Sequence, residues 1–216
     1  MQPLIDSLSS AAPLRVVLFL TAITVLPGVL ISMTAFLRIS LVLSFLRHAL
    51  GLQIPPNQVL IGISLFLTYF VMAEPADRVW NGAVSPYLEG RMRETEALEK
   101  ARAPLAEFML EHTRDEELML MLNLANAPDY ERVDEIPLRT IVPAFLLSEL
   151  RTAFSIGFLL FIPFLVIDLA VAALLNALGM IMLPPTAIAL PFKVLIFVLA
   201  DGWTMVVTAL VRSFTG

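Results

Sequence analysis

Most of this chain consists of apolar segments that are bounded by proline, glycine or charged residues. The longest uncharged run, residues 16–37, is long enough for a helix to cross a hydrocarbon core of about 30 Å. Pro27 interrupts this run, and Pro163 interrupts residues 152–167. Residues 59–73 are apolar but too short for a full crossing. The pattern predicts apolar helices that are kinked, broken or short.

Residues 177–185, between the last two long apolar segments, have the residue types of a turn between helices. Gly179 suits a helix C-terminus because it enters the left-handed region without a Cβ penalty. Pro184 and Pro185 cannot continue the incoming helix but can begin the next one. We therefore predict a helical hairpin with its hinge at these three residues. Flexible or apolar side chains fill the turn: Met180, Ile181 and Met182. They either cap the apolar core of the hairpin or form a gate.

Ionisable side chains within the apolar segments on either side of this turn need partners. An ionisable group in hydrocarbon costs at least about 2.5 kcal/mol and normally faces protein or water. Asp168 and Lys193 are each roughly 14 to 18 Å of helix from the turn, so we expect them to face each other within a hairpin or between subunits. Glu149 and Arg151 point to different sides of a helix and therefore need other partners or interfacial water. Alternatively, Asp168 and Asp201 are proton or ion sites.

The polar part of the chain is acidic. Residues 74–140 hold eight Lys or Arg against fifteen Asp or Glu, a net charge of −7, which favours the outer side of a membrane. Residues 89–123 are predicted to be helical, with a second helix beginning at Pro104. Glu111, His112 and Glu116 have the spacing of a weak metal site, but a solvated helix face is the simpler interpretation.

Composition assigns the class. The chain is 58% hydrophobic and 15% charged, with a mean hydropathy of +0.85, which indicates an all-α integral membrane protein. The absence of cysteine excludes disulfides and thiolate chemistry. The net charge of −5 gives no excess of basic residues for binding nucleic acid. No metalloprotease, phosphate-loop or Ser/His/Asp motif is present. We expect no cofactor, no metal and no enzymatic activity.

Three parts are predicted: N-terminal apolar helices in 1–73, an acidic helical insert in 74–140 and C-terminal hairpins in 141–216. Met1 to Pro13 contains no Lys or Arg, so either the first long helix inserts by itself or a leader has been removed. Because several apolar helices are too short or interrupted to face lipid alone, we expect other protein chains to cover them. The protein is therefore predicted to be oligomeric.

Several stretches together carry a family resemblance: residues 34–39, 55–62, 158–168, 177–185, 190–193 and 201–203. With them the chain resembles the FliP family of flagellar biosynthetic proteins over almost its whole length, most weakly in residues 79–133. Export-gate proteins of virulence-associated injectisomes share much of this pattern and remain an alternative.

The resemblance implies an export gate for unfolded flagellar subunits. Five copies would assemble with FliQ and FliR into a closed helical cone, beside other export-apparatus membrane proteins and the flagellar rod. The cone would sit in the bacterial inner membrane at the flagellar basal body, largely raised towards the periplasm. Met180, Ile181 and Met182 would stack into a gasket that closes the pore. The family often has methionine where this chain has Ile181, so the seal would be slightly less pliable. Asp168, Lys193, Glu149 and Arg151 would pair between helices or subunits.

Two other classes are weaker hypotheses. An ion-coupled secondary transporter would use Asp168 and Asp201 between broken helices, but it should show inverted repeats, and none is apparent. An intramembrane enzyme would need a nucleophile and base, or metal ligands, at membrane depth. His48 and His112 do not lie at such positions. Because no nucleotide motif exists, energy for export must come from partner proteins or the proton gradient.

Overall fold

The computed structural model describes residues 16–127, 130 and 135–215, apart from residues 18, 22, 26, 30 and 181. The described residues form helices and turns and contain no strand, so the predicted all-α class is confirmed. The helices are α2 (Phe36–Leu50), α3 (Asn57–Val71), α4 (Ala73–Val79), the π-helix η1 (Trp80–Val84), α5 (Ser85–Leu88), α6 (Glu94–Glu111), α7 (Asp115–Leu124), α8 (Leu138–Ala177), α9 (Pro185–Leu199) and α10 (Gly202–Thr215).

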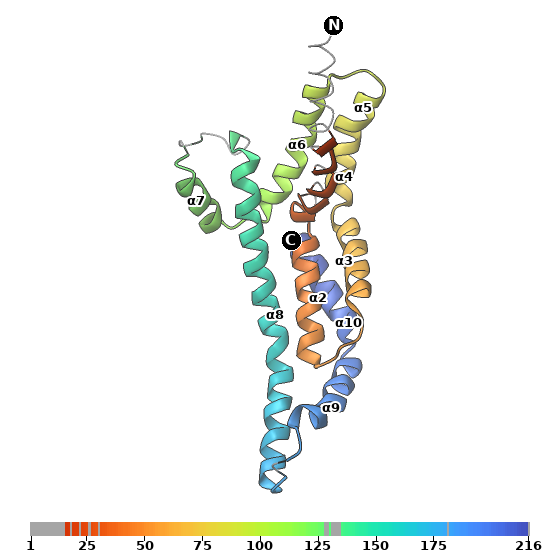
Figure 1. Ribbon diagram of the computed structural model, residues 1–216, viewed down its shortest axis with the longest axis vertical. Helices are drawn as coiled ribbons and strands as arrows, with labels where there is room; N and C mark the ends of the chain where they lie inside the picture. Colours follow the sequence, from red (N-terminus) through yellow and green to blue (C-terminus); the bar gives the residue numbers. More distant parts are fainter. Residues whose placement is uncertain are drawn as a thin grey trace, which may run out of the picture.

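Helix α8 is the axis of the molecule. It runs unbroken for 40 residues, with α2, α9 and α7 packed along it (Figure 1). The prediction that Pro163 breaks this segment is wrong, because both Pro143 and Pro163 lie inside the helix. An interior proline forfeits one backbone hydrogen bond, but the turns on either side retain theirs, and unpaired backbone groups in an apolar setting would be costlier still.

Helix α2 supplies the centre of the core. Its buried apolar residues recur at helical spacing on the face towards α8: Ile39, Val42, Leu43 and Leu46. On α8 the matching buried residues are Ile141, Phe145 and Ala153. This packing covers only one stripe of α8, since just 11% of its most apolar window is buried.

The close approach of α2 and α8 depends on Gly157. A Cβ at this position would overlap the ring of Phe45, with Cγ at 2.8 Å. Phe154 and Phe161 pack edge-on against that ring at centroid distances of 5.0 and 6.5 Å, so a shift of the ring would disturb both contacts. The absence of a side chain at Gly157 thus lets the two helices meet.

Gly157→Ala is therefore expected to destabilise the fold by about 1 to 3 kcal/mol, the usual cost of overpacking a filled core. Gly62→Ala is the matched control, because Gly62 also lies inside a helix but has nothing within 4 Å of its Cβ position. The control should be neutral or stabilising by up to about 1 kcal/mol. Thermal unfolding in detergent micelles compares the two variants, and equal effects would contradict this packing role.

The other apolar helices form bent pairs. Helix α3 meets the helical segment Ala73–Leu88 at 61°, and α9 meets α10 at 64°. By length and composition, α8 is the one described helix able to cross a membrane, or one of three spans if each bent pair counts as one. The expectation of broken apolar helices thus holds for these two pairs. In residues 16–37 the break lies at Met33–Ala35, whereas Pro27 lies in helix.

The acidic segment packs against one end of this bundle. Helix α6 lies against α4 and η1, and both α6 and α7 contact α8 (Figure 1). Pro104 was predicted to begin a second helix, but it lies within α6. The second helix begins at Asp115 instead, after Arg114 in extended conformation, and three carboxylates in its first turn favour a helix N-terminus. The division of the chain into three parts remains a prediction.

Candidate functional site

The turn between α8 and α9 has the backbone geometry that its residue types favour. Gly179 is left-handed at φ 72°. Its N–H donates to the carbonyl of Asn176, and the N–H of Met180 donates to the carbonyl of Leu175, at 3.1 and 2.9 Å. This Schellman arrangement satisfies the last carbonyls of α8. Helix α9 begins at Pro185, where a missing N–H costs no helical hydrogen bond.

The turn between α8 and α9 lies at the lower tip of the molecule in Figure 1. Met182 is 98% exposed and Met180 is 45% exposed. Ile181 lies outside the described residues. An unbranched apolar side chain that its own chain leaves fully uncovered contributes nothing to the core of that chain. The interpretation that Met182 caps the apolar core of the hairpin is therefore wrong for this residue.

Asp168 and Lys193 meet across the hairpin within one chain. The Nζ of Lys193 donates to Oδ2 of Asp168 at 2.6 Å and to the carbonyl of Ala49 at 3.2 Å. The lysine side chain is 7% exposed and that of the aspartate 26%. Because Ala49 lies in the last turn of α2, this cation joins three helices: α2, α8 and α9. The remaining oxygen of Asp168, Oδ1, is buried without a hydrogen-bond partner in the described structure.

Glu149 pairs with Arg38 of α2 in a fully buried site. The Nε of Arg38 donates to Oε2 of Glu149 at 2.9 Å, and Nη2 contacts Oε1. The third nitrogen, Nη1, donates to the carbonyl and the hydroxyl of Ser213 at 2.8 and 2.9 Å. In the sequence, Arg38 directly follows the uncharged run 16–37. Its partners lie 111 and 175 residues away, so no local pattern pointed to them.

Arg151 turns to the opposite side of α8 and contacts α7. Its Nη1 donates to Glu116 and Glu117 at 2.6 and 2.9 Å. The hydrogen bond from Arg151 lowers the pKa of Glu117 below its ordinary value of 4.5, against the opposing effect of burial. Helix α7 is thus attached to α8 by a carboxylate that must remain ionised.

This attachment is expected to weaken in acid. Because the pKa of Glu117 is lowered in the folded state, its contribution to stability is complete above the unfolded value of 4.5 and declines as pH falls through the folded pKa. The difference in unfolding midpoint between the wild type and Glu117→Gln should therefore be constant at neutral pH and shrink in acid. A difference that persists unchanged at pH 3 would contradict this role.

Asp201 occupies the bend between α9 and α10 and does not join the other charges. It is exposed, adopts φ 50°, and its Oδ1 accepts a hydrogen bond from Thr204 at 3.0 Å. The described residues hold no group of three or more His, Asp or Glu that could bind a metal, which leaves Glu111, His112 and Glu116 without support as a site. The described structure therefore assembles no coupled acidic site from Asp168 and Asp201.

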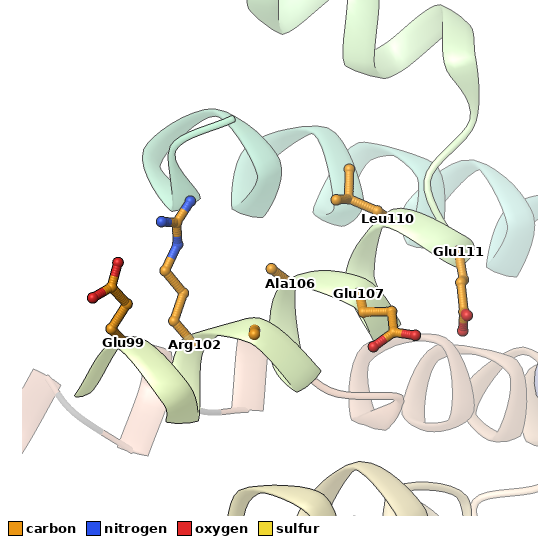
Figure 2. Close-up of a pocket in the computed structure, with 7 residues that line it drawn as sticks. Glu99, Arg102, Ala106, Glu107, Leu110 and Glu111 are labelled. Atoms are coloured by element: carbon orange, nitrogen blue, oxygen red, sulfur yellow. The ribbon is translucent and has the colours of Figure 1, made fainter. Parts of the chain in front are cut away.

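One open cavity lies along α6 (Figure 2). It measures about 610 Å³, and its lining includes Glu99, Arg102, Glu107 and Glu111. Arg102 points away towards the start of α8, where it donates to the carbonyl of Ile136 at 2.7 Å. The carboxylates show no convergence on a common point in Figure 2. We assign no chemistry to this cavity.

Comparisons with known proteins agree with the resemblance found in the sequence. The FliP family profile matches residues 19–210. The chain is 49% identical to the flagellar biosynthetic protein FliP of Bacillus subtilis over 210 residues, covering 97% of this chain and 95% of that protein. It is 47% identical to FliP of Aquifex aeolicus over 204 residues, covering 93% and 85%. For Pectobacterium carotovorum FliP the identity is 48% over 201 residues, covering 93% and 78%.

Proposed function

The chain belongs to the FliP family, and from this membership we propose that it is a core subunit of the flagellar type III protein export gate. In this role several copies, five by the family resemblance, surround a pore with FliQ and FliR in the bacterial inner membrane. Much of the assembly lies on the periplasmic side, next to other export-apparatus proteins and the rod. Unfolded flagellar subunits pass through the pore without any catalytic step.

The observation that carries the proposal is the uncovered methionine turn. Met182 is 98% exposed at the tip of a long apolar hairpin. The same hairpin leaves large apolar side chains of α8 uncovered, among them Phe158, Leu165 and Leu169, each more than half exposed. Apolar surface of this extent marks contact with lipid or with other chains. A closed ring of such hairpins would bring the turns of all copies together.

In the proposed gate, the same side chains would both seal the pore and accept substrate chains of different sequence. A hydrophobic constriction excludes ions because water leaves it. Methionine has three rotatable bonds and no branch, so a ring of Met180, Ile181 and Met182 could close on itself and still deform around a chain of arbitrary sequence. The hinge at Gly179, Pro184 and Pro185 would let the turn move while α8 and α9 keep their shapes.

The ion pairs would keep each subunit rigid behind this flexible turn. Lys193 joins α9 to α8 and α2, and Glu149 with Arg38 joins α8 to α2 and α10. Arg151 adds α7. In the proposed gate, these charges fix the angle at which each hairpin enters the ring.

Complementation tests the function. In a flagellated bacterium that lacks its own FliP, this chain should restore motility and secretion of hook and filament subunits. Native mass spectrometry of the chain co-purified with FliQ and FliR should show several copies of it in one complex. A chain that stays monomeric with both partners would contradict the proposal, since one hinge cannot close a ring. Complementation of an injectisome alone would assign it to the virulence system instead.

Substitutions in the turn between α8 and α9 test whether its methionines seal the proposed pore. Replacing Met180 and Met182 together by alanine is expected to increase ion leakage through the gate, because the shortened side chains leave the constriction wide enough to stay wet. The double leucine variant is the control, since leucine keeps nearly the same apolar volume. Conductance of the purified complex in planar bilayers measures the difference. Equal conductance in the alanine and leucine variants would refute the gasket.

A further inference from the structure

His112 makes two hydrogen bonds that a neutral imidazole cannot make together. Its Nδ1 lies 2.7 Å from the carbonyl oxygen of Phe108, one turn earlier in α6. Its Nε2 lies 3.2 Å from the carbonyl oxygen of Phe214, at the end of α10. A carbonyl oxygen only accepts, so both ring nitrogens must donate. A neutral imidazole carries one N–H and an imidazolium carries two. Both hydrogen bonds can therefore exist together only when the ring is protonated.

His112 contacts the C-terminal end of α10. The last carbonyls of a helix carry a partial negative charge, which attracts cations to its C-terminus. Arg38 already binds this end of α10 through the carbonyl of Ser213 at 2.8 Å, and its guanidinium lies 3.8 Å above the ring of Phe214. His112 is a second side chain that contacts this helix end, through the carbonyl of Phe214.

The charges around the ring come from four helices. They are Arg38 on α2, Glu74 and Arg78 on α4, Glu107 and Glu111 on α6, and Glu149 on α8. Arg38 is neutralised by Glu149, and Arg78 by Glu107 at 2.8 Å. A second open cavity, also of about 610 Å³ and distinct from the one in Figure 2, is lined by Glu74, Glu107, Glu111 and His112 and gives water access to the ring.

We propose that His112 is a pH-sensitive latch that holds the C-terminal turn of α10 against α6. When protonated, the ring bridges the carbonyls of Phe108 and Phe214. When it loses a proton, the shorter bond to Phe108 keeps its N–H, and the lone pair of Nε2 then faces the lone pairs of the Phe214 carbonyl. The latch therefore closes as pH falls and opens as pH rises.

The sequence provides a matched control. His48 is the only other histidine, and its Nδ1 lies 2.6 Å from the carbonyl of Ser44, which is also one turn earlier in its helix. His48 is exposed and lies on α2. It therefore shares the local hydrogen bond of His112 and differs in the contact to α10. His112→Gln and His48→Gln separate the two effects.

Hydrogen exchange of the full chain in detergent micelles, followed by mass spectrometry, tests the latch. After correction for intrinsic exchange rates, amides of residues 210–215 should exchange about tenfold faster at pH 8 than at pH 6, as expected for losing one hydrogen bond to a charged group. The His48→Gln variant should keep this difference, and His112→Gln should abolish it. A wild type without the difference, or a difference that survives in His112→Gln, would overturn the proposal.

A second measurement does not depend on the folding of the His112 variant. In the His48→Gln chain, His112 is the single histidine, so its ring can be observed by nitrogen-15 NMR. At pH 6 both ring nitrogens should be protonated, and at pH 8 Nε2 should have lost its proton. A ring in which one nitrogen stays unprotonated throughout this range would show that Phe214 is not held by an imidazolium and would refute the latch.

Discussion

Glu149→Ala is expected to reduce the free energy of unfolding by about 3 to 5 kcal/mol, the cost of removing one partner of a buried ion pair. The substitution would leave the guanidinium of Arg38 inside the core without its carboxylate, since both side chains are at most 4% exposed. Loss of the carboxylate also releases the side chain that binds the end of α10, so α10 should loosen as well. Unfolding in detergent with increasing denaturant measures the change.

Two further variants identify the cause. Arg38→Met combined with Glu149→Leu removes both charges and should be much less destabilising than either charge deletion alone, because an apolar replacement leaves no buried charge. Glu96→Ala removes a carboxylate that pairs with Lys100 at the surface, where both side chains are more than half exposed, and should change stability by less than about 1 kcal/mol. If the double variant were as unstable as Glu149→Ala, the unpaired charge would not be the reason.

Lys193→Met is expected to destabilise by about 2 to 3 kcal/mol, because it leaves Asp168 and the carbonyl of Ala49 without their donor. The effect should be smaller than at Glu149, since the Asp168 side chain is 26% exposed and water can partly replace the lysine. Lys100→Met at the surface is the control and should be nearly neutral. The same unfolding experiment compares them, together with the amount of assembled complex.

The contact to Ala49 makes charge reversal asymmetric. An aspartate at position 193 would face the Ala49 carbonyl at the C-terminal turn of α2, where a negative charge is unfavourable. We therefore expect the exchange of Asp168 and Lys193 to recover less stability than the neutral pair Asp168→Leu with Lys193→Met. Full recovery by the exchanged pair would show that the Ala49 contact contributes little.

Local chemistry predicted much of the chain correctly. The glycine and prolines around residue 180 contain their own turn signals, and the structure places a Schellman turn and a helix start there. The all-α class followed from the length and apolar character of the segments. Local rules fail at two prolines, because they predict helix boundaries at Pro104 and Pro163, whereas both residues lie inside helices. The cost of one missing hydrogen bond is local, whereas the packing that outweighs it comes from the rest of the fold.

Local sequence patterns could not identify the partners of the charged residues. The sequence could state that Glu149 and Arg151 point apart, because helical geometry fixes their directions. It could not name Arg38 or Glu117 as the partners, since these residues meet them only after α2 and α7 have docked on α8. The same holds for His112, whose spacing suggested at most a weak metal site, and whose contact to Phe214 spans 102 residues.

By itself, the sequence determined the all-α class, the position of the hairpin turn and the family, because these depend on composition, short-range periodicity and residue types in fixed local order. The tertiary structure alone decided which charges neutralise one another, where the long helix tolerates prolines, and that Met182 stays uncovered while His112 contacts the end of α10. The physical reason is that burial and pairing depend on residues far apart in sequence, which only the packed helices bring within hydrogen-bonding distance.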